Sequence, residues 1–232
     1  MYMIASIDPR VAALAPDFRA ISMVLEAGER LVGSVADQAL NETYRVISRD
    51  EPSWGEAHLE AWAQVFRRFD AKPQRTSCSA EALRKRGLRD GLLPRLNPVV
   101  DLYNAISLRF ALPVGGEDLD AYIGQPRLTI TTGSEIFETM KDGQAVEEPP
   151  EPGEAVWRDD RGVTCRRWNR RQGPNPTGYR RPPNVVHLGK LDPNADRSLH
   201  KTRAELGEGL RAMMPDARVQ TSFLVARGTG SD

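Results

Sequence analysis

The sequence has little cysteine, with Cys78 and Cys165 as its only two among 232 residues. Two isolated cysteines exclude a disulfide-rich secreted fold, and their spacing fits no zinc site. We therefore expect a reduced, cytoplasmic protein with free thiols, no metal and no cofactor. The sequence shows no partner base for Cys165, which lies in a strand-like stretch, so we interpret it as a small buried residue rather than a nucleophile.

Long hydrophobic runs and clustered histidines are also missing. No apolar run approaches the length of a transmembrane helix, and Asp8, Pro9 and Arg10 interrupt the N-terminal segment, so we expect neither a membrane span nor a signal peptide. The three histidines are isolated, and none lies beside a Cys, a Ser or a carboxylate in a catalytic motif. A catalytic triad is therefore unsupported.

The chain has no excess charge of either sign, since 32 Lys and Arg balance 32 Asp and Glu. Zero net charge argues against a protein that binds nucleic acid with its whole surface. The balance nevertheless hides two opposed segments. Residues 161–190 hold seven arginines and Lys190 with no acid, a net charge of +8, whereas residues 134–160 hold nine acids against Lys141 and Arg158, a net charge of −7. The two segments either neutralise each other as neighbours or leave the basic one free for an anion.

Helical and strand-like patterns occupy different halves of the chain. The first half has mostly helical spacing, as in residues 55–69, where Leu59, Trp62, Val65 and Phe66 form an apolar stripe. The second half has short strands separated by Gly-containing turns. This order predicts an α+β fold rather than alternating βαβ units. Helices are expected at 34–48, 55–69, 79–86, 99–110 and 197–213, and strands at 20–25, 127–132, 135–140, 154–158, 163–169, 184–189 and 218–226.

The stretch TCRRWNRRQG (164–173) places two arginine pairs around one tryptophan. If residues 163–171 form a strand, alternate side chains point to opposite faces. One face begins apolar and ends with Arg167 and Asn169, which is typical of a strand that lines a cleft. The other face carries Trp168 between two arginines, which fits base stacking or, alternatively, an ordinary solvated hairpin. The candidate nucleic-acid contacts are Arg166, Trp168, Arg170, Arg171, Arg180 and Arg181.

The stretch PVGGEDLD (113–120) joins a Gly-Gly pair to three carboxylates. One hypothesis is a backbone platform that approaches a ligand, with Glu117 or Asp118 holding a cation such as an amino group. The alternative is a turn with an N-capping Asp, because these residue types favour turns for local reasons. The preceding helix carries Asn104, which faces either a pocket or water.

The segment from about Trp54 to Val186 resembles the free-standing B3/B4 domain proteins, which are relatives of the tRNA-editing B3/B4 module in the β subunit of bacterial phenylalanyl-tRNA synthetase. The resemblance implies a layered α+β sandwich with helices and a pocket at the junction of two sub-modules, about 1–125 and 126–232, within one domain, 1–232. The blocks that carry it are KPQRTSCSAEAL (72–83), LPRLNPVVDLYNAISLRFALPVGGEDLD (93–120), GSEIFE (133–138) and PGEAVWRDDRGVTCRRWNRRQG (152–173).

The resemblance also implies a function. In the synthetase, the pocket receives a wrongly attached amino acid on the tRNA 3′ end and hydrolyses its ester. Such a second step is needed because binding separates amino acids that differ by one small group by only about 10–200-fold. The leading hypothesis is therefore a trans-acting aminoacyl-tRNA deacylase whose partner is the aminoacylated tRNA 3′ end, with no DNA or membrane partner.

Two departures from the synthetase module concern its ionisable groups. Gly115 stands where that module has a histidine, and its editing-site glutamate falls near Gln172. Hydrolysis then depends on backbone donors and the ribose hydroxyl, or the protein is a non-catalytic module that binds tRNA or an amino acid. An unrelated small-molecule enzyme is a third reading. The candidate substrate-binding residues are Asn104, Gly115, Gly116, Glu117, Asp118, Arg167, Asn169 and Gln172.

Overall fold

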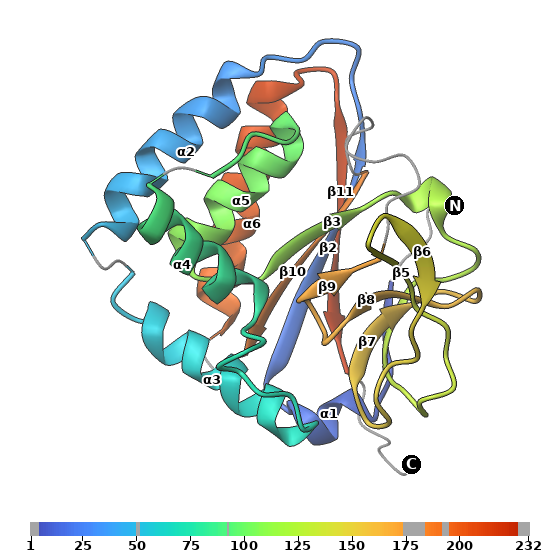
Figure 1. Cartoon of the computed structure of the whole chain (residues 1–232). Coiled ribbons are helices and arrows are strands. Elements are labelled where there is room, and N and C mark those ends of the chain that lie inside the picture. The colour runs from blue at the N-terminus through green and yellow to red at the C-terminus, as the bar shows by residue number, and fades with distance from the viewer. Residues whose placement is uncertain (1–4, 50–51, 92, 174–183, 192–194, 227–232) are drawn as a thin grey trace, which may run out of the picture.

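The computed structural model describes residues 5–49, 52–91, 93–173, 184–191 and 195–226. Two larger sheets, one small hairpin and six α-helices make up this part of the chain, and none of the sheets closes into a barrel (Figure 1). The expected α+β fold class is confirmed. No described helix is both long and apolar enough to cross a bilayer.

The four-stranded sheet is antiparallel throughout, in the order β11-β2-β10-β3. Strand β2 is central and carries a nearly continuous buried run, so both of its faces are covered. The strands expected at 20–25, 184–189 and 218–226 all lie in this sheet. Its members are β2 (Phe18–Glu26), β3 (Val114–Glu117), β10 (Val185–Leu191) and β11 (Arg218–Val225).

The Gly-Gly segment forms the edge strand β3 rather than a turn. Glycine has little intrinsic preference for a strand, so this segment is extended because β10 supplies its hydrogen-bond partners. The turn comes directly afterwards, where the Asp118 side chain accepts a hydrogen bond from the Asp120 amide and caps the 3₁₀-helix η1 (Leu119–Ala121).

The second sheet has five strands in the order β1-β4-β7-β8-β9, with β1 parallel to β4 and the other pairs antiparallel. A separate hairpin, β5–β6, turns at Asp142 and Gly143, which both have positive φ as a two-residue hairpin turn requires. The elements are β1 (Ser6–Ile7), β4 (Arg127–Ile130), β5 (Glu138–Lys141), β6 (Gln144–Glu147), β7 (Ala155–Arg158), β8 (Val163–Arg166) and β9 (Arg171–Gln172).

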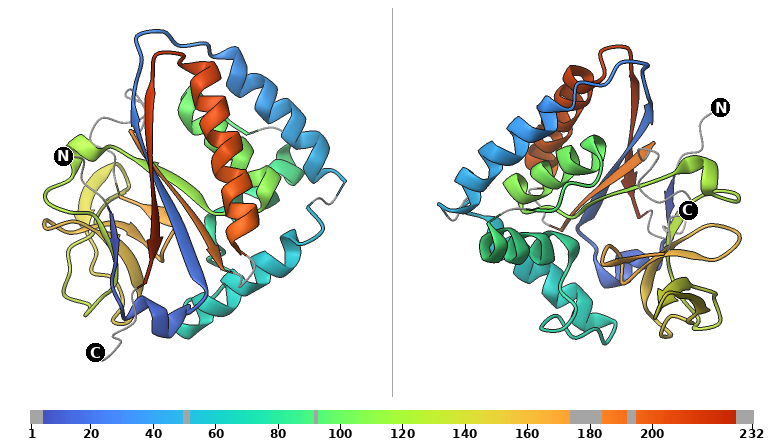
Figure 2. Two further views of the ribbon diagram at one scale, coloured as in Figure 1. Left: turned by 180° about the vertical axis from the view of Figure 1, so that it is seen from behind. Right: turned by 45° about the horizontal axis from the view of Figure 1, so that its top comes forward.

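Three helices cover one face of the four-stranded sheet (Figure 2). One of them, α5, has a well-capped start: the Asn97 side chain accepts a hydrogen bond from the Val99 amide, and a proline occupies the first helical position. The helices are α1 (Val11–Leu14), α2 (Ser34–Ile47), α3 (Gly55–Arg68), α4 (Ser79–Asp90), α5 (Pro98–Phe110) and α6 (Ala195–Met213), and α2, α5 and α6 form the layer.

The other face of the four-stranded sheet packs toward the five-stranded sheet. Phe18 of β2, Trp62 of α3 and Trp157 of β7 belong to one buried cluster with Leu128 and Trp168. This cluster joins residues that are far apart in the sequence, so it forms only when both sheets and α3 are in place.

The strand expected at 163–169 ends at Arg166, which is a correction to the sequence analysis. Arg167 and Trp168 adopt left-handed φ values of 50° and 63°, so the alternation of faces breaks there. Trp168 turns into the core, where it is 1% exposed. The exposed Arg-Trp-Arg row therefore does not exist.

The acidic and basic segments neutralise each other in part, as one alternative held. Arg166 is buried and forms a two-pronged ion pair with the carboxylate of Glu154, through Nε at 3.1 Å and Nη2 at 2.7 Å. Arg161 pairs with Glu138 at 2.5 Å on the surface. Arg170 remains exposed.

Candidate functional site

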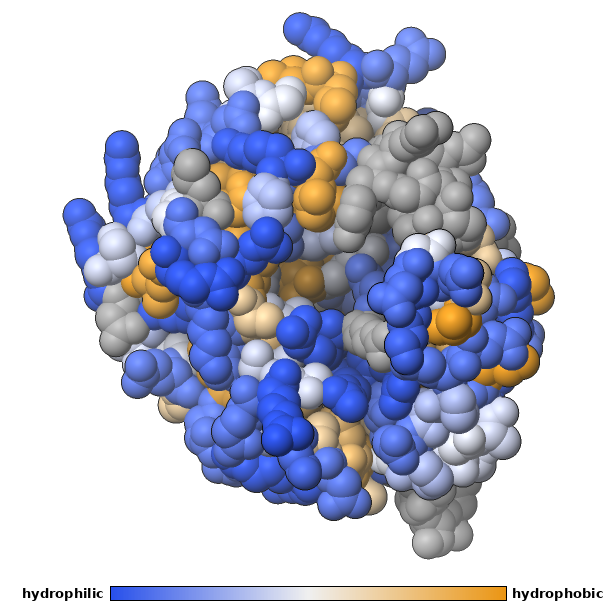
Figure 3. Space-filling view, viewed as in Figure 1, coloured by the Kyte–Doolittle hydropathy of each residue, from blue (hydrophilic) through white to orange (hydrophobic). Residues whose placement is uncertain are grey.

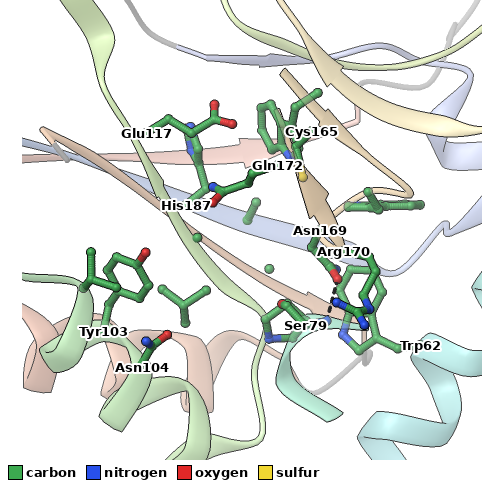
Figure 4. A pocket seen from close by; sticks show the side chains of 18 of the residues that line it. Trp62, Ser79, Tyr103, Asn104, Glu117, Cys165, Asn169, Arg170, Gln172 and His187 are labelled. Carbon is green, nitrogen blue, oxygen red and sulfur yellow. Dashed lines mark hydrogen bonds between the residues drawn. The ribbon is translucent and has the colours of Figure 1, made fainter. Parts of the chain in front are cut away.

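A pocket of about 230 Å³ opens between the two large sheets, beside the start of α4 and one side of α5. Figure 3 shows a hollow near the centre of this face of the molecule, with hydrophobic residues visible inside it and hydrophilic residues around much of its rim. The lining residues come from both halves of the chain, and Figure 4 shows many of their side chains.

The edge strands of the two sheets meet at the pocket. Gln172 of β9 donates a hydrogen bond from Nε2 to the Gly116 carbonyl of β3, at 3.1 Å. Thr164 of β8 donates from Oγ1 to Oε2 of Glu117, at 3.4 Å. These two contacts join the edge strand β3 of one sheet to β8 and β9 of the other, so the shape of the pocket depends on both sheets.

Glu117 makes one end of the pocket acidic. Burial raises the pKa of its carboxyl to about 7; the hydrogen bond from Thr164 opposes this rise, and the nearby Asp159 carboxylate adds to it. No described residue forms a salt bridge with Glu117. Its carboxyl is therefore divided between the neutral and ionised forms near pH 7.

His187 of β10 lies at the same end and is a residue that the sequence analysis missed. Both ring nitrogens are buried without a hydrogen-bond partner among the described residues, and the ring stacks on Trp157 with centroids 4.6 Å apart. Burial lowers the pKa of this histidine to about 4, so the imidazole is neutral at pH 7. In the sequence it stands alone, and only its strand pairing brings it to the pocket.

Hydrogen-bond donors gather at another end of the pocket, where α4 begins. The Ser79 amide donates to Oδ1 of Asn169 at 3.0 Å, while Nδ2 of Asn169 and Oγ of Ser79 are buried without a hydrogen-bond partner in the part of the chain that the structure describes. The indole nitrogens of Trp62 and Trp168 are likewise buried with no hydrogen-bond partner among the described residues. Arg170 also lines the pocket here. A helix N-terminus with surplus donors suits an oxygen that carries negative charge.

A third wall comes from α5. Tyr103 and Asn104 lie together on the side of this helix that faces the pocket, as Figure 4 shows, and Val100 adds apolar surface one turn earlier. The spacing of these residues is helical, so a single face of α5 supplies this wall. Cys165 also lines the pocket and is a buried cysteine that forms no disulfide, in agreement with the expected small buried residue.

The structure brings together seven of the expected site residues and separates others. Asp118 caps η1 and does not line the pocket, and Arg167 donates to Oγ1 of Thr76 at 2.6 Å outside it. Gly116 contributes the carbonyl that holds Gln172. Arg180, Arg181 and the side chain of Arg171 lie outside the described residues. The seven expected residues in the lining are Asn104, Gly115, Glu117, Trp168, Asn169, Arg170 and Gln172, and the unexpected His187 joins them.

One family model matches the chain. The model described as the B3/4 domain covers residues 61–177, which is half of the 232-residue chain. It includes the pocket residues from Trp62 to Gln172 and ends before His187. No curated protein matches the sequence.

Proposed function

Because the chain belongs to the B3/4 domain family, a module related to the tRNA synthetases, we propose that it hydrolyses the ester between a wrongly attached amino acid and the 3′ end of a tRNA. The observation that carries this proposal is the polarity of the pocket. Glu117 forms an acidic end, and Ser79, Asn169 and Arg170 form a donor-rich end. Hydrolysis of an aminoacyl ester needs an acceptor for the proton of the attacking water and donors for the negative charge on the carbonyl oxygen, which are the two kinds of group found at these ends.

The size of the pocket supports the same ligand class. At about 230 Å³ it is smaller than the roughly 300–1,000 Å³ typical of sites for drug-sized ligands. An aminoacyl group fits inside a pocket of this size, whereas the tRNA must remain outside. The tRNA is then contacted at the rim, where the exposed Arg170 offers a planar set of donors for a phosphate.

Deacylation of a panel of tRNAs, each charged with a cognate or near-cognate amino acid, tests this function. We expect single-turnover release from one mischarged species, and a loss of about tenfold or more when Asn104→Ala removes a polar group from the pocket wall. Asn41→Ala, on the exposed side of α2, is the matched control and should leave the rate unchanged. If no tRNA in the panel is deacylated, the proposal is wrong, and salt-dependent tRNA binding would then favour a non-catalytic module.

A second expectation concerns Gly115, which leaves space in the pocket. A Cβ atom at this position would meet only Nε2 of Gln172, at 3.7 Å. The substitution Gly115→Ala should therefore place a methyl group in the pocket without strain. We expect the free energy of unfolding to stay equal or to rise by up to about 1 kcal/mol, because glycine weakens strands. Release should fall sharply, as chemical denaturation and the deacylation assay would show together. Unchanged release would mean that this corner of the pocket is not used.

A further inference from the structure

The pairing of β3 with β10 places an acid and an imidazole on one face of the four-stranded sheet. Gly115 is paired with His187, and Glu117 is paired with Val185. Directly paired residues of antiparallel strands present their side chains on the same face, so Glu117 and His187 are diagonal neighbours, roughly 7–8 Å apart. Figure 4 shows both in the pocket, together with Gln172.

The space between these two groups is open because Gly115 has no side chain to fill it. The position that its Cβ would take lies 3.7 Å from Nε2 of Gln172 and within 4 Å of no other atom outside the neighbouring residues. A gap of this size, bounded by a carboxylate, an imidazole and a carboxamide, has the two or more polar partners that a water molecule needs.

Both groups have unused hydrogen-bonding capacity. Neither ring nitrogen of His187 has a partner among the described residues. The carboxylate of Glu117 accepts one long hydrogen bond, from Thr164 at 3.4 Å. Buried polar groups are rarely left unpaired, and each exception requires an explanation. A water molecule held between Glu117 and His187 would explain the unused hydrogen-bonding capacity of both residues.

We propose that Glu117 is the general base that activates the hydrolytic water in this pocket, and that His187, as a neutral imidazole, positions that water. This inference rests on the proposed deacylase function. It differs from what the resemblance implies, because the two groups stand at positions 117 and 187 rather than at 115 and 172. The residue that positions the water therefore lies on β10, beyond the part of the chain that the family model covers.

The chemical step is balanced with these residues alone. The water oxygen attacks the ester carbonyl carbon while its proton passes to the Glu117 carboxylate. Donors at the start of α4, such as Nδ2 of Asn169, stabilise the negative charge on the carbonyl oxygen. The bond from the carbonyl carbon to the 3′ oxygen then breaks, and Glu117 returns the proton to that oxygen. The products are the free amino acid and a tRNA with a 3′ hydroxyl.

The surroundings of Glu117 suit a base that works near neutral pH. Its carboxyl has a pKa of about 7, and efficient general bases have pKa values close to the working pH. The titratable and charged groups that face it are the Asp159 carboxylate, the neutral His187, the Cys165 thiol and, across the pocket, the Arg170 guanidinium. Hydrolysis should therefore increase with pH through about 7, as the Glu117 carboxylate forms.

The first test is the isosteric variant Glu117→Gln in the single-turnover assay. We expect the rate to fall about 10²–10⁴-fold, which is the usual contribution of a general base, and the rise with pH near 7 to disappear. Binding of a non-hydrolysable aminoacyl amide should change much less than the rate. Glu208→Gln, at an exposed site on α6, is the control. A Glu117→Gln variant that keeps the wild-type rate and pH profile would overturn the assignment while leaving the deacylase function intact.

The second test needs no substrate, so it can fail separately from the proposed function. The pKa of the Glu117 carboxyl is raised in the folded state, so between about pH 4.5 and 7 the folded protein keeps a proton that the unfolded chain has lost. The free energy of unfolding of the wild type should therefore fall as pH rises through this range. The lowered pKa of His187 makes the free energy of unfolding rise with pH, but it does so equally in the wild type and in Glu117→Gln, so this effect cancels when the two are subtracted. Relative to Glu117→Gln, the wild type should lose stability across this range. If the difference in unfolding free energy between the wild type and Glu117→Gln does not change with pH, the proposal is wrong, whether or not any tRNA is deacylated.

The role of His187 has its own variant. His187→Phe keeps a ring to stack on Trp157 but removes both nitrogens. We expect slower release with the pH dependence near 7 retained, because Glu117 still titrates. Loss of the pH dependence, or an unchanged rate, would contradict a positioning role.

Discussion

The replacement Glu154→Ala is expected to lower the free energy of unfolding by roughly 3–5 kcal/mol, because it removes the buried carboxylate that holds Arg166 through two hydrogen bonds and leaves only the more distant, partly exposed Glu148. Glu154 is 2% exposed and Arg166 is 6% exposed, so neither charge can recover hydration without unfolding. The same carboxylate also accepts hydrogen bonds from the Arg167 amide at 2.8 Å and the Glu151 amide at 3.3 Å. One side chain therefore holds an ion pair and two backbone groups.

The loss of Glu154 should also disturb the pocket. Its bond to the Arg167 amide secures the left-handed turn through which Trp168 and Asn169 reach the lining. The matched control is Glu148→Ala, since Glu148 pairs with the same arginine at 3.5 Å but has 35% of its side chain exposed. Denaturant unfolding should show a cost of about 1 kcal/mol or less for the control. If the two variants lost equal free energy of unfolding, burial of the ion pair between Glu154 and Arg166 would not be the cause of the loss.

The replacement Trp168→Ala is the second large effect, with an expected loss of roughly 3–5 kcal/mol, as is usual when a buried tryptophan is truncated. Trp168 packs edge-to-face on Phe18 and Trp62, with ring centroids 4.9 and 5.4 Å away. Because its ring also lines the pocket, the cavity left by the truncation should join the pocket and enlarge it. Thermal or denaturant unfolding measures the first effect, and the range of amino acids released measures the second.

Two comparison variants make the Trp168 result interpretable. Trp168→Phe keeps an aromatic ring in the core and should recover part of the stability. Phe223→Ala, at a side chain that is 53% exposed, should cost far less. If Trp168→Ala weakened tRNA binding and left stability unchanged, the residue would be acting as an exposed stacking platform, as the sequence analysis expected, rather than as part of the core.

The local patterns of the sequence were sufficient for much of the fold. The apolar stripe Leu59, Trp62, Val65 and Phe66 lies on α3, and the nearly continuous apolar run at 20–25 lies on the central strand β2. Both patterns depend on one element only. The spacing of apolar residues along a helix or strand directly reflects which of its faces are buried. Strand β3 was missed because its two glycines carry no such signal.

The candidate site was predicted where it depends on contiguous blocks. Asn104, Gly115, Glu117 and Asn169 were singled out from short stretches, and all four line the pocket. His187 was missed because an isolated histidine looks the same in sequence whether it is inert or in a site. Its place depends on the pairing of β10 with β3, which joins segments about seventy residues apart.

The sequence by itself determined the α+β class, most of the helices and strands, and membership of the B3/4 family, because each of these is written in local periodicity or in contiguous motifs. Only the tertiary structure decided which arginines can contact a ligand in the pocket. Arg166 is buried against Glu154, Arg167 turns away to Thr76, and Arg170 lines the pocket. The physical reason is that a buried carboxylate recruits the nearest guanidinium and backbone amide, which ends the strand after Arg166 and reverses the faces that alternation alone would assign.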